Sequence, residues 1–422
     1  MPLPLTPGVY VEEVPSGARP IEAVGTSTPA FIGFAGSPDA PVGEPVAVNN
    51  WLQYLRLFPS EGPSTPLTLA VAGFFGNGGQ RCFVLNVGEE GTLTGTTRRP
   101  GISVLEEVDE IAIVAAPGYT DAASYEALLQ HCENLKDRVA ILDAPLEIED
   151  ISQLTRVGTA PPDAGPDATP SDAAADGSSE DAKAKSGRGR SGGPQASAAP
   201  GAAPRQSSWG SFYFPWIRVV DPATGRIVEA PPSGHLAGVW ARTDATHGVH
   251  KAPANEPIRG AVDLTYRLTS AEQGEQNTAG VNGIRFFSTE GIKVWGARTL
   301  AGSSSEWRYL NVRRLFAMVE ESIMQGMNWI PFQINDRILW NMITRDVESF
   351  LERLHRQGAL MGRTPAEAFF VKCDDESNPR SEIDAGVVTT YVGLAPVKPA
   401  EFIVFKVSQF QGGASVEQEG QL

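Results

Sequence analysis

The chain has 422 residues, and its 50 acidic residues outnumber its 34 basic ones, which gives a formal net charge of −16. This length predicts two or three domains with enough apolar surface for a substantial core. The acidic balance argues against a duplex nucleic-acid binder, because such proteins neutralise phosphates with Lys and Arg. Cys82, Cys132 and Cys373 form no CxxC pair. We therefore expect reduced thiols, and neither a zinc knuckle nor a disulfide framework.

No targeting or membrane-spanning segment is predicted. The start, MPLPLTPGVYVEEV, lacks a basic stretch followed by an apolar one. No window approaches the roughly 18 to 20 apolar residues that a membrane span requires. We expect cytoplasmic assembly, no stable membrane insertion and no nucleic-acid partner.

Strands and helices alternate before residue 158. Apolar runs predict strands at 29–36, 81–87, 110–116 and 138–143, and helical spacing predicts helices at 49–58, 67–75 and 120–135. The strands at 110–116 and 138–143 flank the third helix, which makes a βαβ unit and therefore a parallel pair.

Residues 158–207 differ from the rest of the chain. They contain 13 Ala, 8 Gly, 7 Pro and 7 Ser, and no Val, Ile, Leu, Met, Phe, Tyr or Trp. Such a segment cannot bury enough apolar surface to offset its ordering entropy. We predict a disordered insertion. Its basic cluster at 183–190 is interpreted as part of a solvated linker, with an anionic partner site as the less favoured alternative.

The part after the insertion is more helical. The apolar core is expected to resume abruptly at 209–220, and a loop-rich stretch follows. Helices are expected at 307–325 and 336–357, and strands at 369–373, 387–392 and 402–407. The predicted fold class is α/β (mixed α+β), with two domains, the disordered insertion and extended terminal β-strand arms.

Each end of the chain carries a short strand pattern. GVYVEEV, residues 8–14, lies between two prolines, and FIVFKVSQF, residues 402–410, precedes a polar tail. A terminal strand can complete its own sheet or add to the open edge of a neighbour. The residues alone leave both alternatives open.

A search for catalytic or metal chemistry finds no complete constellation. FFGNGGQRC lacks the Lys-Ser/Thr pair of a phosphate-binding loop and follows a predicted helix. His247 and His250, with Asp244, have no third ligand at diagnostic spacing. No cofactor, metal site or catalytic residue is predicted. An α/β hydrolase that uses the segment from His235 to His250 stays open as an alternative.

Two arginine clusters are candidates for structural or interface roles. Trp295, Gly296 and Arg298 lie together in VWGARTL, and Arg313 and Arg314 follow in NVRRLF. Guanidinium groups stack on aromatic rings and pair with carboxylates. An arginine that fixes a turn is favoured over an interface contact.

Several segments together resemble the tail sheath family of contractile phages and phage-like injection systems. They are PGVYVEEV, FFGNGGQRCFVLNV, YFPWIRVVDP, PSGHLAGVWARTD, GVNGIRFFSTEGIKVWGARTL, WRYLNVRRLF and PAEFIVFKVSQF. They occur in the family's order and cover nearly the whole chain outside 158–207. The inner tube or a baseplate component of the same machine is disfavoured, because tube proteins are shorter and mainly β.

The resemblance implies a non-enzymatic structural subunit. Family members polymerise as a helical sheath around an inner tube in a metastable extended state, and they contract to drive the tube through a target envelope. Other copies of the chain, the tube protein, and baseplate and cap proteins are the implied partners. The implied domains are an N-terminal exchange arm at 1–20, an outer α/β domain at 21–260, an inner sheath domain at 261–400, and a C-terminal strand or arm at 401–422.

The resemblance also implies that terminal arms are exchanged between subunits. The N-terminal arm comprises Gly8, Val9, Tyr10, Val11, Glu12, Glu13 and Val14. The C-terminal arm includes Phe402, Ile403, Val404, Phe405, Lys406, Val407 and Phe410.

Overall fold

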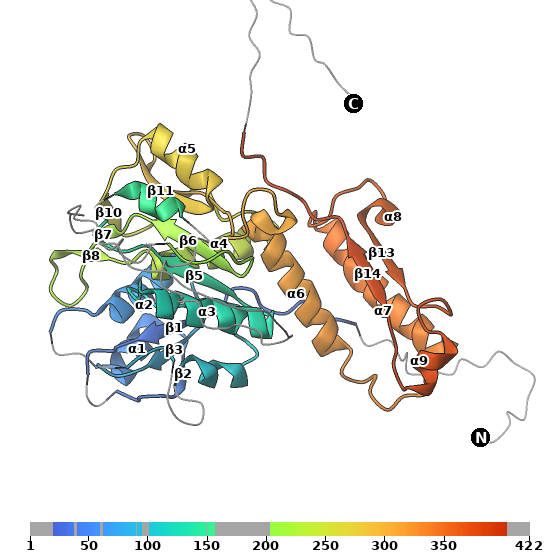
Figure 1. The fold of residues 1–422 in the computed structure, drawn as a ribbon. Helices are drawn as coiled ribbons and strands as arrows, with labels where there is room; N and C mark the ends of the chain where they lie inside the picture. The colour runs from blue at the N-terminus through green and yellow to red at the C-terminus, as the bar shows by residue number, and fades with distance from the viewer. Residues whose placement is uncertain are drawn as a thin grey trace, which may run out of the picture.

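The computed structural model describes residues 20–37, 40–59, 62–89, 91–94, 101–148, 150–156 and 203–402. Within these ranges a large sheet with helices packed around it lies beside a smaller unit of helices and two strands (Figure 1). Helix α6 (Leu310–Gly326) lies between the two units and contributes side chains to both cores.

The large sheet has nine strands in the order β2-β3-β1-β4-β5-β6-β11-β12-β9. The strands are β1 (Pro29–Gly33), β2 (Pro45–Val48), β3 (Cys82–Asn86), β4 (Ile113–Ala115), β5 (Val139–Asp143), β6 (Gly210–Phe214), β9 (Glu256–Pro257), β11 (Val281–Phe287) and β12 (Gly291–Trp295). Strands β3, β1, β4, β5, β6 and β11 are parallel, and β2, β12 and β9 add antiparallel edges. The parallel βαβ unit predicted across 110–143 is confirmed.

The remaining elements are as follows. A three-stranded sheet contains β10 (Ala261–Leu264), β7 (Ile217–Val220) and β8 (Ile227–Ala230) in that order. Around the large sheet lie α1 (Trp51–Leu57), α2 (Pro66–Gly76), α3 (Ala122–Leu135), α4 (Ser233–His247), α5 (Ser270–Thr278), and short helices η1 (Ile102–Glu107), η2 (Ile151–Thr155) and η3 (Glu306–Arg308). The smaller unit contains α7 (Arg337–Arg356), α8 (Pro365–Ala368), α9 (Arg380–Asp384), β13 (Phe369–Lys372) and β14 (Tyr391–Leu394).

Local capping explains where the first helices begin. The side chains of Asn50, Thr65 and Asp121 each accept a hydrogen bond from the backbone N–H three residues later. This contact satisfies one of the free N–H groups of the first turn. The predicted helices at 49–58, 67–75 and 120–135 are confirmed.

The prediction of a loop-rich stretch after β7 is wrong, because Ser233–His247 forms the 15-residue helix α4. Two glycines made this segment resemble a loop, and the packing explains their presence. A Cβ on Gly234 would lie 2.2 Å from Ala70 Cα, and one on Gly238 would lie 2.6 Å from the carbonyl oxygen of Phe74. The glycines therefore allow α4 to approach α2 closely, at the cost of helix propensity.

The segments after the insertion differ in detail from their sequence patterns. The apolar run at 209–220 forms two strands, β6 and β7, which lie in different sheets on either side of Pro215. A proline has no N–H for a sheet ladder. The last strand of the smaller unit is β14, which begins at Tyr391, later than the predicted 387. The predicted strand at 402–407 lies outside the described residues except for Phe402.

The predicted insertion ends earlier than residue 207. Most of it lies outside the described residues, but residues 203–207 pack on α3. Arg205 pairs with Glu126 at 2.7 Å and with Glu133 at 2.8 Å. Ser207 is buried and its hydroxyl donates to Glu133. These charged contacts hold in place a segment that has few apolar residues. Composition alone does not reveal such contacts.

The predicted domain boundary at residue 260 runs through the large sheet, because β11 and β12 belong to it. The larger apolar core continues to Ala317 in α6. Leu315, Met318 and Val319 of the same helix belong to the smaller core with α7. Helix α6 is thus the element where the packing changes from one unit to the other.

Candidate functional site

The two ends of the described chain dock as extended segments around α6. We call residues 20–28 the N-terminal stem and residues 395–402 the C-terminal stem. Each stem lies next in sequence to a segment for which the family resemblance implies an exchanged arm. The contacts that fix the stems show how the two ends of the described chain are held on the folded body.

The N-terminal stem is held by both helices of the smaller core. Ile21 is fully buried in that core, and its carbonyl oxygen accepts a hydrogen bond from Arg353 of α7. The N–H of Val24 donates to the hydroxyl of Ser322 at 3.0 Å. Both polar contacts join the stem to positions about 300 residues later in the sequence.

A buried ion pair completes this attachment. Arg314 on α6 contacts both carboxylate oxygens of Asp244 on α4, at 3.0 and 2.5 Å, and also donates to the carbonyl oxygen of Thr26 at 3.0 Å. The Thr26 hydroxyl donates to the same carboxylate at 2.7 Å. The side chains of the pair are only 3% and 5% exposed, and the guanidinium lies 4.7 Å from the ring of Trp240. Arg314 therefore joins α4, α6 and the N-terminal stem.

Arg313 is also a structural arginine in the folded subunit. Its guanidinium lies between the rings of Trp209 and Trp307, at 4.0 and 4.4 Å. Glu320 is 3.3 Å away. Burial lowers the pKa of Arg313 from its usual high value. The two rings provide the attraction that a buried cation needs.

The C-terminal stem follows β14 and crosses the ends of α7 and α6. The N–H of Met361 donates to the carbonyl oxygen of Ala395 at 2.7 Å, and the N–H of Val397 donates to that of Ala359 at 3.3 Å. The amide of Asn311, at the start of α6, donates to the carbonyl oxygen of Val397 at 3.1 Å.

Arg298 fixes the last part of this stem. Its Nε lies 3.0 Å from Oε1 of Glu401, and its Nη1 donates to the carbonyl oxygen of Asn277 at 2.9 Å. Glu401 raises the pKa of Arg298 above its usual value. The N–H of Arg298 also donates to Asn282 at 2.7 Å. The arginine is 8% exposed, so it acts inside the subunit as a link between the large sheet and the stem.

Gly296 and Trp295 complete the predicted cluster in different ways. A Cβ on Gly296 would lie 2.8 Å from the amide oxygen of Asn282, so the chain needs glycine to turn here. Trp295 is 38% exposed and contacts the ring of Phe287 at 4.6 Å. Among the five residues of the two arginine clusters, Trp295 alone presents a large surface to solvent.

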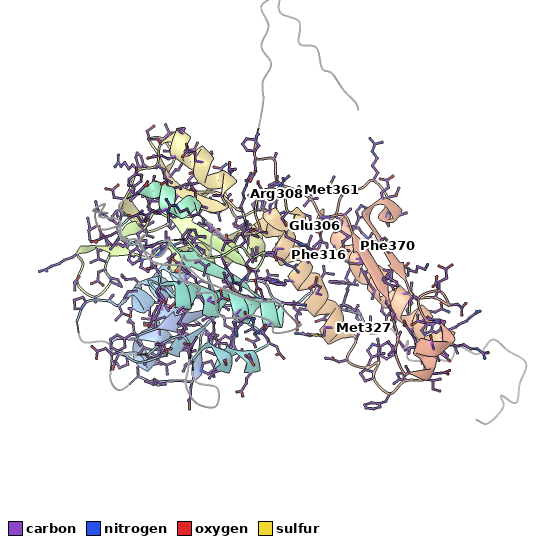
Figure 2. The ribbon with its side chains drawn as sticks, viewed as in Figure 1. Glu306, Arg308, Phe316, Met327, Met361 and Phe370 are labelled. Atoms are coloured by element: carbon purple, nitrogen blue, oxygen red, sulfur yellow. The ribbon has the colours of Figure 1, made fainter. Side chains whose placement is uncertain are left out.

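The two-stranded sheet of the smaller unit has open edges. β13 and β14 pair with each other, from Phe369 opposite Leu394 to Lys372 opposite Tyr391. Within the described ranges neither strand has a second partner. Phe370 and Tyr391 are 60% and 57% exposed. Figure 2 labels Phe370 on β13, and Met327 at the C-terminal end of α6. Open edges present backbone groups that a further strand can pair with.

The structure does not describe most of the residues of the two predicted arms. Gly8–Val14 and residues 403–410 lie outside the described residues. Phe402 is described, is 77% exposed and belongs to no strand. Strand exchange by these arms therefore stays a prediction.

The hydrolase alternative has no support. The region it relied on is α4, where His235 is fully enclosed and burial lowers its pKa to about 4. A Cβ on Gly73 of α2 would lie 2.2 Å from Nδ1 of His235, so the imidazole packs directly on the backbone of α2. Among the described residues no three His, Cys, Asp or Glu side chains gather to hold a metal ion. Likewise, no described helix is long and apolar enough to cross a membrane.

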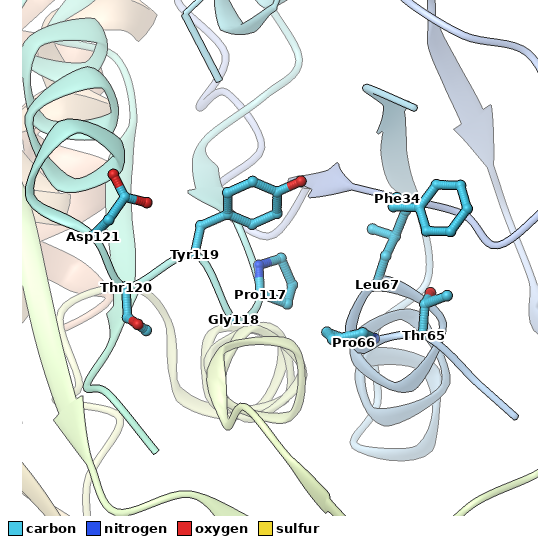
Figure 3. Close-up of a pocket in the computed structure, with 9 residues that line it drawn as sticks. All are labelled: Phe34, Thr65, Pro66, Leu67, Pro117, Gly118, Tyr119, Thr120 and Asp121. Carbon is cyan, nitrogen blue, oxygen red and sulfur yellow. The ribbon is translucent and has the colours of Figure 1, made fainter. Parts of the chain in front are cut away.

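A pocket of about 400 Å³ lies at the carboxyl ends of β1 and β4. Chain connections diverge between these strands, which is where α/β sheets often bind ligands. Figure 3 shows the Tyr119 ring extending across this pocket toward Phe34. The carboxylate of Asp121 is occupied with capping α3 through Ser124. The lining therefore offers no catalytic pair.

Comparison with known families agrees with this geometry. The model described as phage tail sheath protein central domain matches residues 102–300, and the one described as phage tail sheath C-terminal domain matches residues 303–410. The boundary between them falls just before α6.

The chain belongs to the phage tail sheath family. It is 28% identical over 197 residues to a putative prophage major tail sheath protein of Pseudomonas aeruginosa (strain UCBPP-PA14), over 46% of this chain and 49% of that relative. It is 28% identical over 196 residues to the tail sheath protein of Salmonella phage ViI, over 46% of this chain and 30% of that relative. The chain thus spans about half the length of the first relative, and less of the second.

Similar solved structures cover nearly the whole sheath chain. The PVC sheath complex of an extracellular contractile injection system, in the contracted state, is 26% identical, with a TM-score of 0.74 over 97% of this chain and 99% of that one. The anti-feeding prophage helical sheath in the contracted state is 30% identical, with a TM-score of 0.71 over 96% and 99%. A sheath tail protein from Listeria innocua, 12% identical, shares the fold with a TM-score of 0.53 over 90% and 96%.

Sequence reasoning found the arginines but missed their partners. Asp244 was considered as a possible metal ligand, and it instead pairs with Arg314. Glu401, Ser322 and Asn311 gave no local signal, because their contacts join segments far apart in the chain. A search for carboxylates near each predicted arm would have selected Glu401.

Proposed function

We propose that this chain is the structural sheath subunit of a contractile phage tail-like injection machine, with no enzymatic role. Copies of the chain polymerise around an inner tube in an extended, metastable state. On triggering, the sheath contracts and drives the tube through a target envelope. The likeness to contracted sheath complexes over 97% of the chain is the observation that carries this proposal.

Exchanged strands hold the lattice together in this proposal. The arm at 8–14 of one subunit and the arm at 402–410 of another add to the open edges of β13 and β14. The open edges and the exposed Phe370 and Tyr391 support this assignment. Strand addition depends mainly on backbone hydrogen bonds, so it persists while side-chain contacts rearrange.

The stems let a folded body turn without losing its neighbours. The stem contacts at Arg314 and Arg298 are buried within one subunit, whereas the arms begin beyond them. A change of angle between subunits is therefore absorbed between the stem and the exchanged strand. The energy for contraction is stored as a free-energy difference between two lattice packings.

Other partners follow from the same proposal. The inner tube fills the sheath, and baseplate and cap proteins close its two ends, with assembly in the cytoplasm. The anti-feeding prophage baseplate structure contains a similar chain, at 30% identity and a TM-score of 0.71. The insertion is expected on the outside of the sheath. Both of its flanks, Arg156 and the segment beginning at residue 203, belong to the unit of the large sheet, and the family resemblance implies that this unit is the outer domain.

Assembly of purified protein tests the proposal. Wild-type chain is expected to form long hollow cylinders in negative-stain electron microscopy. The double variant Val9→Pro, Val11→Pro removes two backbone donors from the arm and should leave folded, dispersed subunits. The control Val9→Thr, Val11→Thr keeps both donors and β-branched side chains and should still assemble. Cylinders from the proline variant would refute the arm assignment, and uniform small particles from wild-type chain would refute the sheath role.

A further inference from the structure

A groove of about 900 Å³ lies beneath the C-terminal stem. We call it the stem groove. It is bounded by the end of α4 with the turn after it, by α5, by Trp295 at the end of β12, and by stem residues 397–402. The Arg298–Glu401 pair fixes one wall, and the amide of Gln273 donates to the carbonyl oxygen of Trp295 at 3.2 Å. The groove is therefore built by rigid elements rather than by a single loop.

The stem groove is cationic on a strongly acidic chain. Lys251, Arg285 and Lys398 line it, together with two histidines, His247 and His250. Lys251 forms an ion pair with Glu256 at 3.8 Å, so its charge is partly balanced. Neither Arg285 nor Lys398 pairs with a carboxylate among the described residues.

The single acidic side chain in the lining adds no free negative charge. Glu401 is engaged by Arg298 and is only 17% exposed. With a net charge of −16 for the whole chain, a groove of net positive charge is a local exception. Such a groove attracts an acidic segment and repels a basic one.

The groove also has an apolar side suited to a peptide. Trp295, which is 38% exposed, lines the groove together with Pro399 and several alanines. An aromatic face beside cationic groups binds a peptide that carries carboxylates among small residues. Glutamates spaced two apart in an extended peptide lie on the same side, so both can face the cations.

The sequence contains such a segment next to the groove. Phe402, the last described residue, lines the groove, so the rest of the chain departs from its rim. Residues 411–422, QGGASVEQEGQL, carry Glu417 and Glu419 and no Lys or Arg. Gly412 and Gly413 allow the sharp turn that a return to the groove needs.

We propose that in the free subunit the acidic tail segment 414–419 binds in the stem groove of its own chain. Glu417 and Glu419 then face Arg285 and Lys398, and the small residues lie against Trp295. A tail bound in this way folds residues 402–410 back on their own subunit. If the proposed sheath function holds, tail binding competes with donation of the C-terminal arm and delays assembly until a neighbour captures the arm.

The test uses the full chain with the substitution Ser415→Cys, labelled with bimane, a dye that tryptophan quenches on contact. The three native cysteines are buried, so we expect the dye to react with the new thiol at residue 415. At a concentration where sedimentation shows single subunits, Trp295→Phe should raise bimane emission roughly twofold or more, as expected when the quencher is removed from a mostly occupied groove.

Charge variants separate the tail contact from general effects. Arg285→Glu with Lys398→Glu should give the same loss of quenching, and adding Glu417→Lys with Glu419→Lys should restore it. Arg267→Glu, at an exposed arginine outside the lining, is the control and should change nothing. Rising salt should weaken the quenching, since the contact is between partly exposed charges.

The outcomes distinguish the inference from the proposed function. Emission that is unaffected by Trp295→Phe, or quenching that appears only as the protein concentration rises, would overturn binding of the tail to its own groove.

The variant Glu417→Gln, Glu419→Gln should shorten the lag before cylinders form. An unchanged lag would overturn the proposed competition between tail binding and assembly. Cylinders that form from a chain without quenching leave the sheath role intact, whereas quenching without cylinders supports the tail contact and contradicts the sheath role.

Discussion

Arg298 and Glu401 form an ion pair across 103 residues of sequence that ties the C-terminal stem to the end of the large sheet. We predict that Glu401→Gln releases the stem and reduces assembly. The change should cost about 1–3 kcal/mol of folding free energy, since it leaves a mostly buried guanidinium without its charged partner. Urea unfolding measures this loss, and electron microscopy measures assembly.

The matched control for this pair is Arg337→Gln. Arg337 pairs with Asp375 with similar geometry, but the two side chains are 75% and 66% exposed. Exposed pairs contribute little, so this variant should change stability by less than about 1 kcal/mol. Equal losses for Glu401→Gln and Arg337→Gln would contradict the special role of the buried pair.

The N-terminal stem depends on the pair of Arg314 and Asp244. Replacing Asp244 with Asn leaves the buried guanidinium uncompensated and should lower the free energy of unfolding by about 3–5 kcal/mol. The double variant Asp244→Asn, Arg314→Met removes both charges and should lose less than Asp244→Asn alone. Additive losses in the urea-unfolding cycle would show that the two residues act independently.

Two buried histidines should contribute a loss of stability in mild acid, because they resist protonation. Burial lowers the pKa of His235 to about 4, and burial together with Arg138 lowers that of His131 to about 4. The histidines of the unfolded chain are protonated near pH 6.5, so their contribution to stability is constant above this pH and is lost as pH falls toward 4. The loss reaches on the order of 3 kcal/mol for each histidine.

Comparison with His235→Leu isolates one of these contributions. The variant should lose less stability than wild type between pH 7 and 4.5 in urea unfolding. Carboxyl groups, including Asp143, whose pKa burial raises to about 7, contribute to both proteins and cancel in the comparison. Parallel pH profiles for the two proteins would contradict the assignment.

Close packing of α4 on α2 gives a prediction with a matched control. Gly234→Ala forces a Cβ into the backbone of Ala70 and should destabilise the subunit by about 1–3 kcal/mol. Gly274→Ala, on α5, meets nothing within 4 Å and should stabilise it by up to about 1 kcal/mol. Thermal unfolding of both variants checks the opposite signs.

The predicted insertion should be dispensable for assembly. Replacing residues 158–202 with a short Gly/Ser linker keeps Arg205 and Ser207 on α3 and should still give cylinders. The deletion stops at 202 because the next residues carry structural contacts. If this variant kept its far-ultraviolet circular dichroism spectrum but formed no cylinders, the insertion would have to contribute to the contacts between subunits.

Local patterns predicted the elements whose signal lies in neighbouring residues. The apolar spacing in α3 and α7 is such a signal, and both helices are confirmed. Helix α4 was missed because its glycines serve a contact with α2 that spacing does not encode. The stem contacts were missed for a related reason, since Arg314 finds Asp244 across 70 residues. Side-chain types showed which arginines mattered, and only the fold showed their partners.

Cryo-electron microscopy of the extended particle tests the central claim most directly. The account predicts a helical sheath in which residues 8–14 and 402–410, from two different neighbours, add as strands to β13 and β14 of a third subunit. A sheath in which β13 and β14 stay two-stranded, or in which both arms pair within their own subunit, would contradict it.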